Sequence, residues 1–341
     1  MDDRPSSIVQ DSSSIVHRPW SNRRVLVTGA TGIIGSWLVR ELLAQGAHVV
    51  ALVLDADPQS EFFRSGDYRR SSIVNGCLED FPTLERAINQ HEADTVFHLG
   101  AQTIVNTAYR SPLPTFEANI RGTYNLLEAC RLHADLVQGV VIASSDKAYG
   151  EKPQLPYTEE MTLNGRYPYD VSKTCADLLA QAYYHTYGLP IAIARCGNVY
   201  GGGDLNWSRI VPGTVRSLLR GERPIIRSDG TYVRDYIYVK DIVRAYMRLA
   251  ECLGDGRVRG QAFNFSTENP MTVLEMVETI RKLMDCPHLE PDIQSCAEGE
   301  IRRQHLSAAK ARQILKWEAT FGLESGLHET IAWYRSFLGE P

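Results

Sequence analysis

Apolar residues recur in short continuous runs along the chain up to about residue 195. The runs lie at 24–28, 49–54, 95–99, 137–143 and 191–194, and stretches with the apolar spacing of amphipathic helices separate them. A strand that is buried on both faces has apolar side chains in both directions, as in a parallel sheet covered by helices. The pattern therefore predicts an α/β fold with a doubly wound parallel sheet of the Rossmann type.

The pattern changes after about Asn198. Glycine and proline interrupt shorter elements, and two further helices are predicted over 273–284 and 323–337. We therefore expect three parts: an N-terminal tail over 1–20, a Rossmann domain over 21–197, and a smaller mixed lobe over 198–341.

Composition narrows the classes of protein that fit. A net charge of -5 over 341 residues argues against broad binding of nucleic acid or an anionic membrane, although a local arginine cluster can still bind a small anion. No apolar run is long enough to span a membrane, and the first 20 residues lack the apolar stretch of a signal peptide. Seven scattered cysteines without a Cys-x-x-Cys pair predict free thiols and no metal site. We expect a cytoplasmic protein.

A glycine-rich turn follows the first predicted strand. Gly29, Gly32 and Gly35 are spaced three apart in VTGATGIIGSWL, between a strand and a helix. Such glycines permit a tight turn and bring a pyrophosphate close to the helix N-terminus, where free N–H groups favour negative charge. Asp55, at the end of the second run, can bind the adenosine ribose and repel a 2′-phosphate, which favours NAD over NADP. Asp57 competes for this role, and a solvated loop acid is the alternative.

Tyr169 and Lys173, in YDVSK, are candidate catalytic residues. They are four positions apart and so share one face of a helix. The unperturbed pKa of a phenol is about 10, and a nearby ammonium together with an oxidised nicotinamide lowers it. Ser145 ends an earlier apolar run, and ligands of open parallel sheets bind outside the carboxyl ends of the strands. The alternative is a packed tyrosine beside a surface lysine.

The motifs around these residues resemble those of the extended short-chain dehydrogenases/reductases, the group that modifies nucleotide sugars. The similarity runs from about Trp20 to Phe337. The matching segments are the 29–35 loop, FHLGAQ (97–102), NIRGTYNLLEA (119–129), SSDKAYG (144–150), YDVSK (169–173), RCGNVYGGGD (195–204), RDYIYVKD (234–241) and FNFS (263–266).

This resemblance implies an NAD cofactor and a nucleoside-diphosphate sugar substrate. It also implies that the Rossmann domain over 21–197 binds NAD and that the lobe over 198–341 mainly binds the substrate, with some of its segments returning to the sheet. The implied cofactor contacts are Gly29, Gly32, Ile33, Ile34, Gly35, Asp55, Cys77, Leu78, Leu99, Ala101, Tyr169 and Lys173. The implied substrate contacts are Gln102, Asn119, Asn198, Arg209, Arg227 and Arg234. Among the substrate contacts, Arg234 matches a position that usually pairs with the diphosphate. Relatives also pair the helices near 105–133 and 167–187, which implies a homodimer.

The two residues after Ser145 bear on the reaction. The family's 4-epimerases usually have small or apolar residues there, whereas enzymes resembling 4,6-dehydratases have an acid and a base; this chain has Asp146 and Lys147. Once C4 of the sugar is a ketone, the C5 proton is acidic, and loss of water needs a base at C5 and an acid at the 6-hydroxyl. We assign Asp146 as the acid and Lys147 as the base. A polar turn after the strand is the alternative.

The Asp-Lys pair resembles that of CDP-glucose 4,6-dehydratases, as do GSWL (35–38) and GNVYGGGD (197–204). The pair also occurs in enzymes resembling UDP-N-acetylglucosamine 4,6-dehydratases. Ala30 and Ile34 depart from the His and Lys usual in the CDP-glucose enzymes, and Cys77 replaces a common Asp at the adenine. We expect an NAD-dependent nucleotide-sugar 4,6-dehydratase, with CDP-glucose as the first substrate to test. A 4-epimerase and a catalytically silent NAD-sensing protein are the alternatives.

Overall fold

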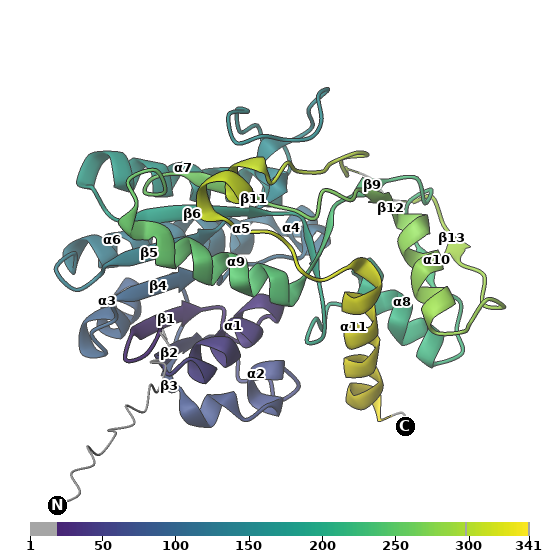
Figure 1. The fold of residues 1–341 in the computed structure, drawn as a ribbon, viewed down its shortest axis with the longest axis horizontal. Helices are drawn as coiled ribbons and strands as arrows, with labels where there is room; N and C mark the ends of the chain where they lie inside the picture. Colours follow the sequence, from purple (N-terminus) through teal and green to yellow (C-terminus); the bar gives the residue numbers. More distant parts are fainter. Residues whose placement is uncertain (1–18, 297–298, 340–341) are drawn as a thin grey trace, which may run out of the picture.

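Seven parallel strands form the central sheet of the protein. The computed structural model describes residues 19–296 and 299–339 (Figure 1). The strand order is β11-β6-β5-β4-β1-β2-β3, and every neighbouring pair is parallel. The strands are β1 (Arg24–Thr28), β2 (His48–Val53), β3 (Ser72–Asn75), β4 (Thr95–His98), β5 (Gly139–Ala143), β6 (Ile191–Cys196) and β11 (Ala262–Phe265). The predicted α/β fold is confirmed.

Helices cover both faces of the sheet and create two cores. One face is covered by α1 (Ile33–Ala44) and α9 (Val239–Glu251). The other is covered by α3 (Phe81–Gln90), α6 (Gly122–Leu132) and α7 (Pro168–Tyr187). In β1, Val25 and Val27 belong to the first core and Leu26 to the second, and all three are fully buried. Burial in both directions explains why the run is continuously apolar.

Two strands were not predicted from apolar runs. β3 has the sequence SIVN and buries only Val74, because it lies at the edge of the sheet. β11 is wholly buried but includes Asn264, whose polar side chain interrupts the apolar pattern. Both strands therefore lack the continuous apolar run by which the other five were found.

Short helical segments complete the first half of the chain. They are α2 (Glu61–Arg64), α4 (Val105–Arg110), α5 (Pro112–Phe116), the 3-10 helices η1 (Asp67–Arg70) and η3 (Asp146–Tyr149), and the π-helix η2 (Glu117–Arg121). Two further segments lie later in the chain, the 3-10 helix η4 (Cys252–Gly254) and the π-helix η5 (Ala311–Leu315). Of these, η3 matters most for the site, because it follows directly on the carboxyl end of β5.

A smaller lobe lies at the carboxyl end of the sheet. β6 ends at Cys196, and β7 (Asn198–Tyr200) begins the lobe two residues later, paired with β10 (Tyr236–Tyr238). The lobe also contains α8 (Ile210–Leu219), α10 (Val273–Leu283) and α11 (Leu323–Leu338), which lie together on one side of the sheet (Figure 1). Its other pairs are β8 (Ile225–Ile226) with β13 (Asp292–Ile293), and β9 (Val233–Arg234) with β12 (Met271–Thr272). Between these segments the chain returns to the sheet as α9 and β11.

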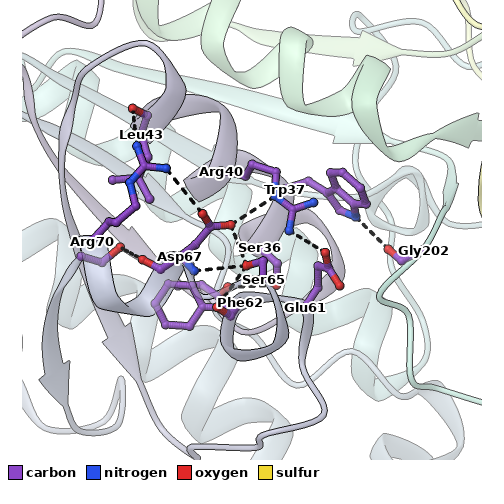
Figure 2. A network of polar contacts seen from close by, with 12 residues as sticks. Ser36, Trp37, Arg40, Leu43, Glu61, Phe62, Ser65, Asp67, Arg70 and Gly202 are labelled. Atoms are coloured by element: carbon purple, nitrogen blue, oxygen red, sulfur yellow. Dashed lines mark hydrogen bonds and ion pairs between the residues drawn. The ribbon is translucent and has the colours of Figure 1, made fainter. Parts of the chain in front are cut away.

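Polar contacts join the first helix to the lobe (Figure 2). Trp37 of α1 donates its indole N–H to the carbonyl oxygen of Gly202 at 2.8 Å. Arg40, one turn later, pairs with Glu61 at 2.5 Å. Glu61 in turn accepts a hydrogen bond of 2.8 Å from the indole of Trp333 in α11. The helix α1 is therefore held to the lobe directly through Trp37 and indirectly through Glu61 of α2.

The N-terminal tail was expected to end at about residue 20. Residues 1–18 of that tail lie outside the described residues. Trp20 is 1% exposed and donates its indole N–H to Glu251 of α9 at 2.8 Å, so it belongs to the core of the folded domain. Among the described residues, none of the helices has the length and apolar character needed to cross a bilayer.

Candidate active site

One large cavity lies between the carboxyl ends of the strands and the lobe. Its volume is about 970 Å³, and the turn after every strand from β1 to β6 contributes to its wall. The lobe closes the opposite side with α8 and the segments around β8 and β9. This is the place where open parallel α/β sheets bind their ligands.

The glycine turn forms one wall of the cavity. Gly29 has φ of +71°, and a Cβ there would lie 2.7 Å from the backbone nitrogen of Gly100. A Cβ on Gly35 would lie 2.1 Å from the carbonyl oxygen of Gly29. α1 begins at Ile33 after Gly32, and no side chain caps its first N–H groups. The turn thus offers a bare helix N-terminus to the cavity, which suits a pyrophosphate.

Asp55 lies at the far end of the same wall. It is exposed, lines the cavity and stands two residues beyond the end of β2. Asp57 also lines the cavity, but its carboxylate accepts a hydrogen bond from the backbone of Gln59 at 2.8 Å. Other residues that the resemblance names as cofactor contacts also line the cavity, namely Ile33, Ile34, Cys77, Leu78, Leu99 and Ala101. Within the described residues, the carboxylate of Asp55 accepts no such hydrogen bond from its own loop.

Ser145 and Tyr169 meet in the middle of the cavity wall. Ser145 is the N-cap of η3, and Tyr169 lies in the first turn of α7. Burial raises the pKa of Tyr169 to about 12, while the nearby Arg209 and a hydrogen bond with Ser145 oppose that rise. The phenol of the protein alone therefore stays protonated at neutral pH.

Lys173 lies one turn further along α7. Its ammonium donates a hydrogen bond of 2.8 Å to the carbonyl oxygen of Ala143, at the end of β5. Burial lowers the pKa of Lys173 to about 8. From the sequence, Lys173 was expected to tune Tyr169; Arg209 is a second cation near Tyr169, and its charge lowers the pKa of that phenol.

A buried polar network holds these elements in place. Asp177 of α7 pairs with Arg195 of β6 through two hydrogen bonds of 2.8 and 2.9 Å. Arg195 also donates to the hydroxyl of Tyr149 in η3 at 2.8 Å, and that hydroxyl donates to Asn264 of β11 at 2.8 Å. These bonds join α7, β6, η3 and β11 to one another. This network was not found from the sequence, although an arginine inside the apolar run IAIARC is a signal for a buried ion pair.

Asp146 and Lys147 follow Ser145 and line the cavity. Asp146 is 2% exposed; its Oδ1 accepts a hydrogen bond of 3.0 Å from the Ser145 hydroxyl, and its Oδ2 accepts one from the amide of Gln304. Lys147 is half-buried, and burial together with the charge of Arg234 lowers its pKa. An acid and a base therefore lie beside Ser145 and Tyr169.

Two residues of this group were not found from the sequence. Asp170 directly follows Tyr169, is 3% exposed and lines the cavity. Burial raises the pKa of Asp170 to about 6, and the nearby Lys147 opposes that rise. Its position after Tyr169 was the only signal in the sequence. Gln304 gave no signal, because it contacts Asp146 across 158 positions of the chain.

Asn119 was expected among the substrate contacts, and the structure corrects this. It is 1% exposed and is not among the residues that line the cavity. Its side chain accepts from the backbone N–H of Gln102 at 2.7 Å and donates to the Gln102 carbonyl at 3.0 Å and to Ser172 at 2.9 Å. A side chain whose polar atoms are bound in this way shapes the loop of Gln102, which does line the cavity.

Three arginines line the lobe side of the cavity, together with Asn198. Arg209 pairs with Asp204 at 3.0 Å, and Arg234 pairs with Glu300 at 3.0 Å. Arg227 donates to the carbonyl oxygen of Ser208 at 3.0 Å. Guanidinium groups bind phosphate oxygens with two parallel hydrogen bonds, so this side of the cavity suits a diphosphate.

Comparison with known proteins places this site in a family. The model of the NAD dependent epimerase/dehydratase family matches residues 25–264. A CDP-glucose 4,6-dehydratase from Salmonella typhimurium is 31% identical over 340 residues, which cover 94% of this chain and 92% of that protein.

Two solved structures illustrate the similarity of fold. A UDP-glucose 4-epimerase from Thermotoga maritima, solved with UDP-glucose, matches with a TM-score of 0.84 and 29% identity over 92% of this chain and 99% of that one. A dTDP-glucose 4,6-dehydratase from Bacillus anthracis, solved with NAD, matches with a TM-score of 0.81 and 28% identity over 92% of this chain and 97% of that one. The resemblance found in the sequence is confirmed: this chain is an enzyme of the NAD-dependent epimerase/dehydratase family, within the group of nucleotide-sugar 4,6-dehydratases and 4-epimerases, and its cofactor is NAD.

Proposed function

We propose that this enzyme is a nucleotide-sugar 4,6-dehydratase, which converts a nucleoside-diphosphate hexose to its 4-keto-6-deoxy product. The observation that carries the proposal is the acid and base beside Ser145. Asp146 and Lys147 both line the cavity, next to Tyr169. Epimerisation at C4 needs neither group, whereas loss of water across C5–C6 needs both. The 31% identity to a CDP-glucose 4,6-dehydratase makes CDP-glucose the first substrate to test.

The proposed reaction assigns one proton movement to each residue. Tyr169 removes the proton of the 4-hydroxyl, which Ser145 orients, as the sugar loses a hydride from C4. Lys147 then removes the C5 proton, and Asp146 protonates the 6-hydroxyl so that it leaves as water. NAD, when bound, supplies the acceptor of the C4 hydride and the donor that returns it at C6.

The protons of this scheme balance over one cycle. Lys147 returns its proton to C5, so Tyr169 ends with one extra proton and Asp146 lacks one. The Ser145 hydroxyl donates to Asp146 at 3.0 Å, and Ser145 also lies close enough to Tyr169 to lower the pKa of that phenol. Ser145 is therefore placed to pass the proton from Tyr169 to Asp146 and restore both residues.

The surroundings of Lys147 favour its role as a base. A base acts in its neutral form, and the burial of Lys147 and the charge of Arg234 both lower its pKa. A lowered pKa keeps the neutral form present down to lower pH. The rate of dehydration should therefore fall as the pH drops through the pKa of Lys147.

The product mass tests the proposed reaction. The purified enzyme is incubated with NAD and, separately, with CDP-, UDP-, dTDP- and GDP-hexoses, and each product is weighed by mass spectrometry. We expect one of these sugars, with CDP-glucose tried first, to lose the mass of one water molecule. A product of unchanged mass with an inverted C4 would instead establish a 4-epimerase, the alternative that the similarity to the Thermotoga maritima enzyme favours.

Replacing Lys147 by arginine tests the base. An arginine keeps the positive charge but stays protonated at every accessible pH, so it cannot remove the C5 proton. We expect the rate of dehydration to fall about 100-fold or more, while calorimetry shows unchanged binding of NAD. Lys152→Arg is the matched control, because its ammonium binds Thr162 and is not among the residues that line the cavity. Wild-type dehydration by Lys147→Arg would show that another group is the base.

The cofactor contacts of the glycine turn are tested at Gly35. An alanine Cβ there would lie 2.1 Å from the carbonyl oxygen of Gly29, so the turn must open. We expect Gly35→Ala to weaken NAD binding about tenfold or more, as measured by titration calorimetry of the NAD-free protein. Gly254→Ala is the control, because a Cβ at that position meets no atom within 4 Å. Equal affinity in the two variants would place the pyrophosphate elsewhere.

We also propose that the enzyme is a homodimer that pairs α6 and α7 with their copies. Leu132 of α6 and Leu178 and Tyr187 of α7 are 50%, 52% and 57% exposed. The two helices are linked side by side, because Tyr183 of α7 donates to Glu128 of α6 at 3.1 Å. Large apolar side chains on two adjacent helices are typical of a surface that a second copy covers.

Sedimentation equilibrium tests the dimer. Leu178→Arg introduces a charge into the proposed interface, and we expect it to raise the dimer dissociation constant about tenfold or more. Ile73→Arg is the control. Ile73 is a partly exposed apolar residue of β3, which is the edge strand at the end of the sheet opposite to β11 and β6. The same dimer in both variants would exclude this interface.

A further inference from the structure

The segment 301–307 crosses from the lobe to the cofactor domain and is fixed on both sides. On the lobe side, the backbone nitrogen of Val233 donates to the carbonyl of Arg302 at 2.9 Å, and that of Gln304 donates to the carbonyl of Val233 at 3.2 Å. On the domain side, the backbone nitrogen of Tyr157 donates to the carbonyl of His305 at 2.9 Å. Gln304 lies between these contacts, so its backbone is held in one place.

The side chain of Gln304 ends on Asp146. It is 0% exposed, and its Nε2 donates to Oδ2 of Asp146. Its Oε1 has no partner within the part of the chain that the structure describes. The amide therefore presents its N–H to the carboxyl group of Asp146, and its own oxygen faces away from that contact. A buried amide that leaves one atom unpaired is costly, so the bond from its N–H to Asp146 is the side-chain contact that holds this amide within the described residues.

The same segment contacts the arginine on the diphosphate side of the cavity. Glu300, just before it, pairs with Arg234 at 3.0 Å, and Arg234 also donates to the carbonyl of Arg302 at 3.4 Å. At the other end, the backbone nitrogen of Leu306 donates to Asp235 at 3.2 Å. One short segment therefore touches both the proposed diphosphate site and the proposed acid.

We propose that Gln304 is a positioning residue for Asp146, which fixes the orientation of its carboxyl group from the substrate lobe. This proposal rests on the proposed dehydratase function. When Asp146 gives its proton to the 6-hydroxyl, the C6–O6 bond breaks and water leaves with that proton. The carboxylate that remains accepts hydrogen bonds from the Gln304 amide and the Ser145 hydroxyl. These donors stabilise the ionised form and so favour proton transfer to the leaving group.

Several titratable groups lie near Asp146, so each variant is compared with the wild type at the same pH. The titratable and charged groups that face Asp146 from the surrounding elements are Lys147, Tyr157, Tyr169, Asp170, Cys196 and Asp235. The pKa of Asp235 is raised by burial to about 6. Asp235 is present in the wild type and in each variant. The ratio of their dehydration rates at one pH therefore reports the effect of position 304.

Two substitutions at Gln304 test the proposal through the pH profile of dehydration, from about pH 5 to about pH 9. Gln304→Leu removes the donor at similar size, and we expect the maximal rate to fall about tenfold or more at every pH. KM should change little, because Arg234 keeps its contacts.

Gln304→Glu keeps the shape of the amide. The introduced carboxyl group donates a hydrogen bond to Asp146 when it is protonated and repels the Asp146 carboxylate when it is ionised. Its rate relative to wild type should therefore be high at low pH and fall with rising pH toward that of Gln304→Leu.

Gln294→Leu is the matched control, since Gln294 also donates to an aspartate, Asp292, at 3.1 Å, but on the surface. We expect it to match the wild type at every pH. Equal pH profiles for wild type and Gln304→Glu, with wild-type rates in Gln304→Leu, would overturn the positioning role and leave the dehydratase function standing. Parallel losses in Gln304→Leu and Gln304→Glu at every pH would show a merely structural role. A wild-type enzyme that only epimerises would overturn the proposed function first, and the positioning role with it.

Discussion

The buried ion pair between Asp177 and Arg195 is the contact on which the geometry of the site depends. It joins the helix of Tyr169 to the strand that leads into the lobe, and through Tyr149 it reaches the turn of Asp146. Both charged side chains are almost fully buried, at 0% and 3% exposure. Removal of one partner of such a pair leaves an uncompensated buried charge, at a cost of about 3–5 kcal/mol. The pair therefore keeps the elements that carry the proposed base of the first step and the proposed acid of the second in one arrangement.

The fold could be predicted from the sequence, and the residues that line the centre of the cavity could be named from it, because both depend on local signals. Continuous apolar runs located five strands, and the spacing of Gly29, Gly32 and Gly35 located the turn that the structure brings against Gly100. Tyr169 and the Asp146-Lys147 pair come directly from short motifs, and the cavity contains all three.

The features that the sequence could not supply depend on contacts between distant segments. Gln304 reaches Asp146 across 158 positions, and Glu300 reaches Arg234 across 66, with no periodicity that links them. Asn119 was expected to contact the substrate because its motif matches, but only the packed structure shows that its polar atoms are already bound to Gln102 and Ser172. Strands β3 and β11 were not predicted for the same reason. Their tertiary positions decide that β3 is exposed at the sheet edge and that the asparagine of β11 is buried.

The shared fold leaves the choice of reaction to a few side chains. Dehydratases and epimerases of this family match the chain with similar TM-scores, so the fold cannot separate them. In the proposed scheme the first step belongs to Tyr169 in both reactions, and Lys147 and Asp146 decide whether elimination comes next. The lobe contributes to this choice through Arg234, which lowers the pKa of Lys147, and through Gln304, which binds Asp146.

The destination of the C4 hydrogen tests the proposed dehydration most directly. The nucleotide hexose that the enzyme converts, with CDP-glucose tried first, is labelled with deuterium at C4 and incubated with the NAD-loaded enzyme, and the position of the label in the product is determined by NMR. We predict that the deuterium appears at C6 of a 4-keto-6-deoxy sugar. Deuterium that remains at C4 of a sugar with an intact 6-hydroxyl would contradict the proposed dehydration.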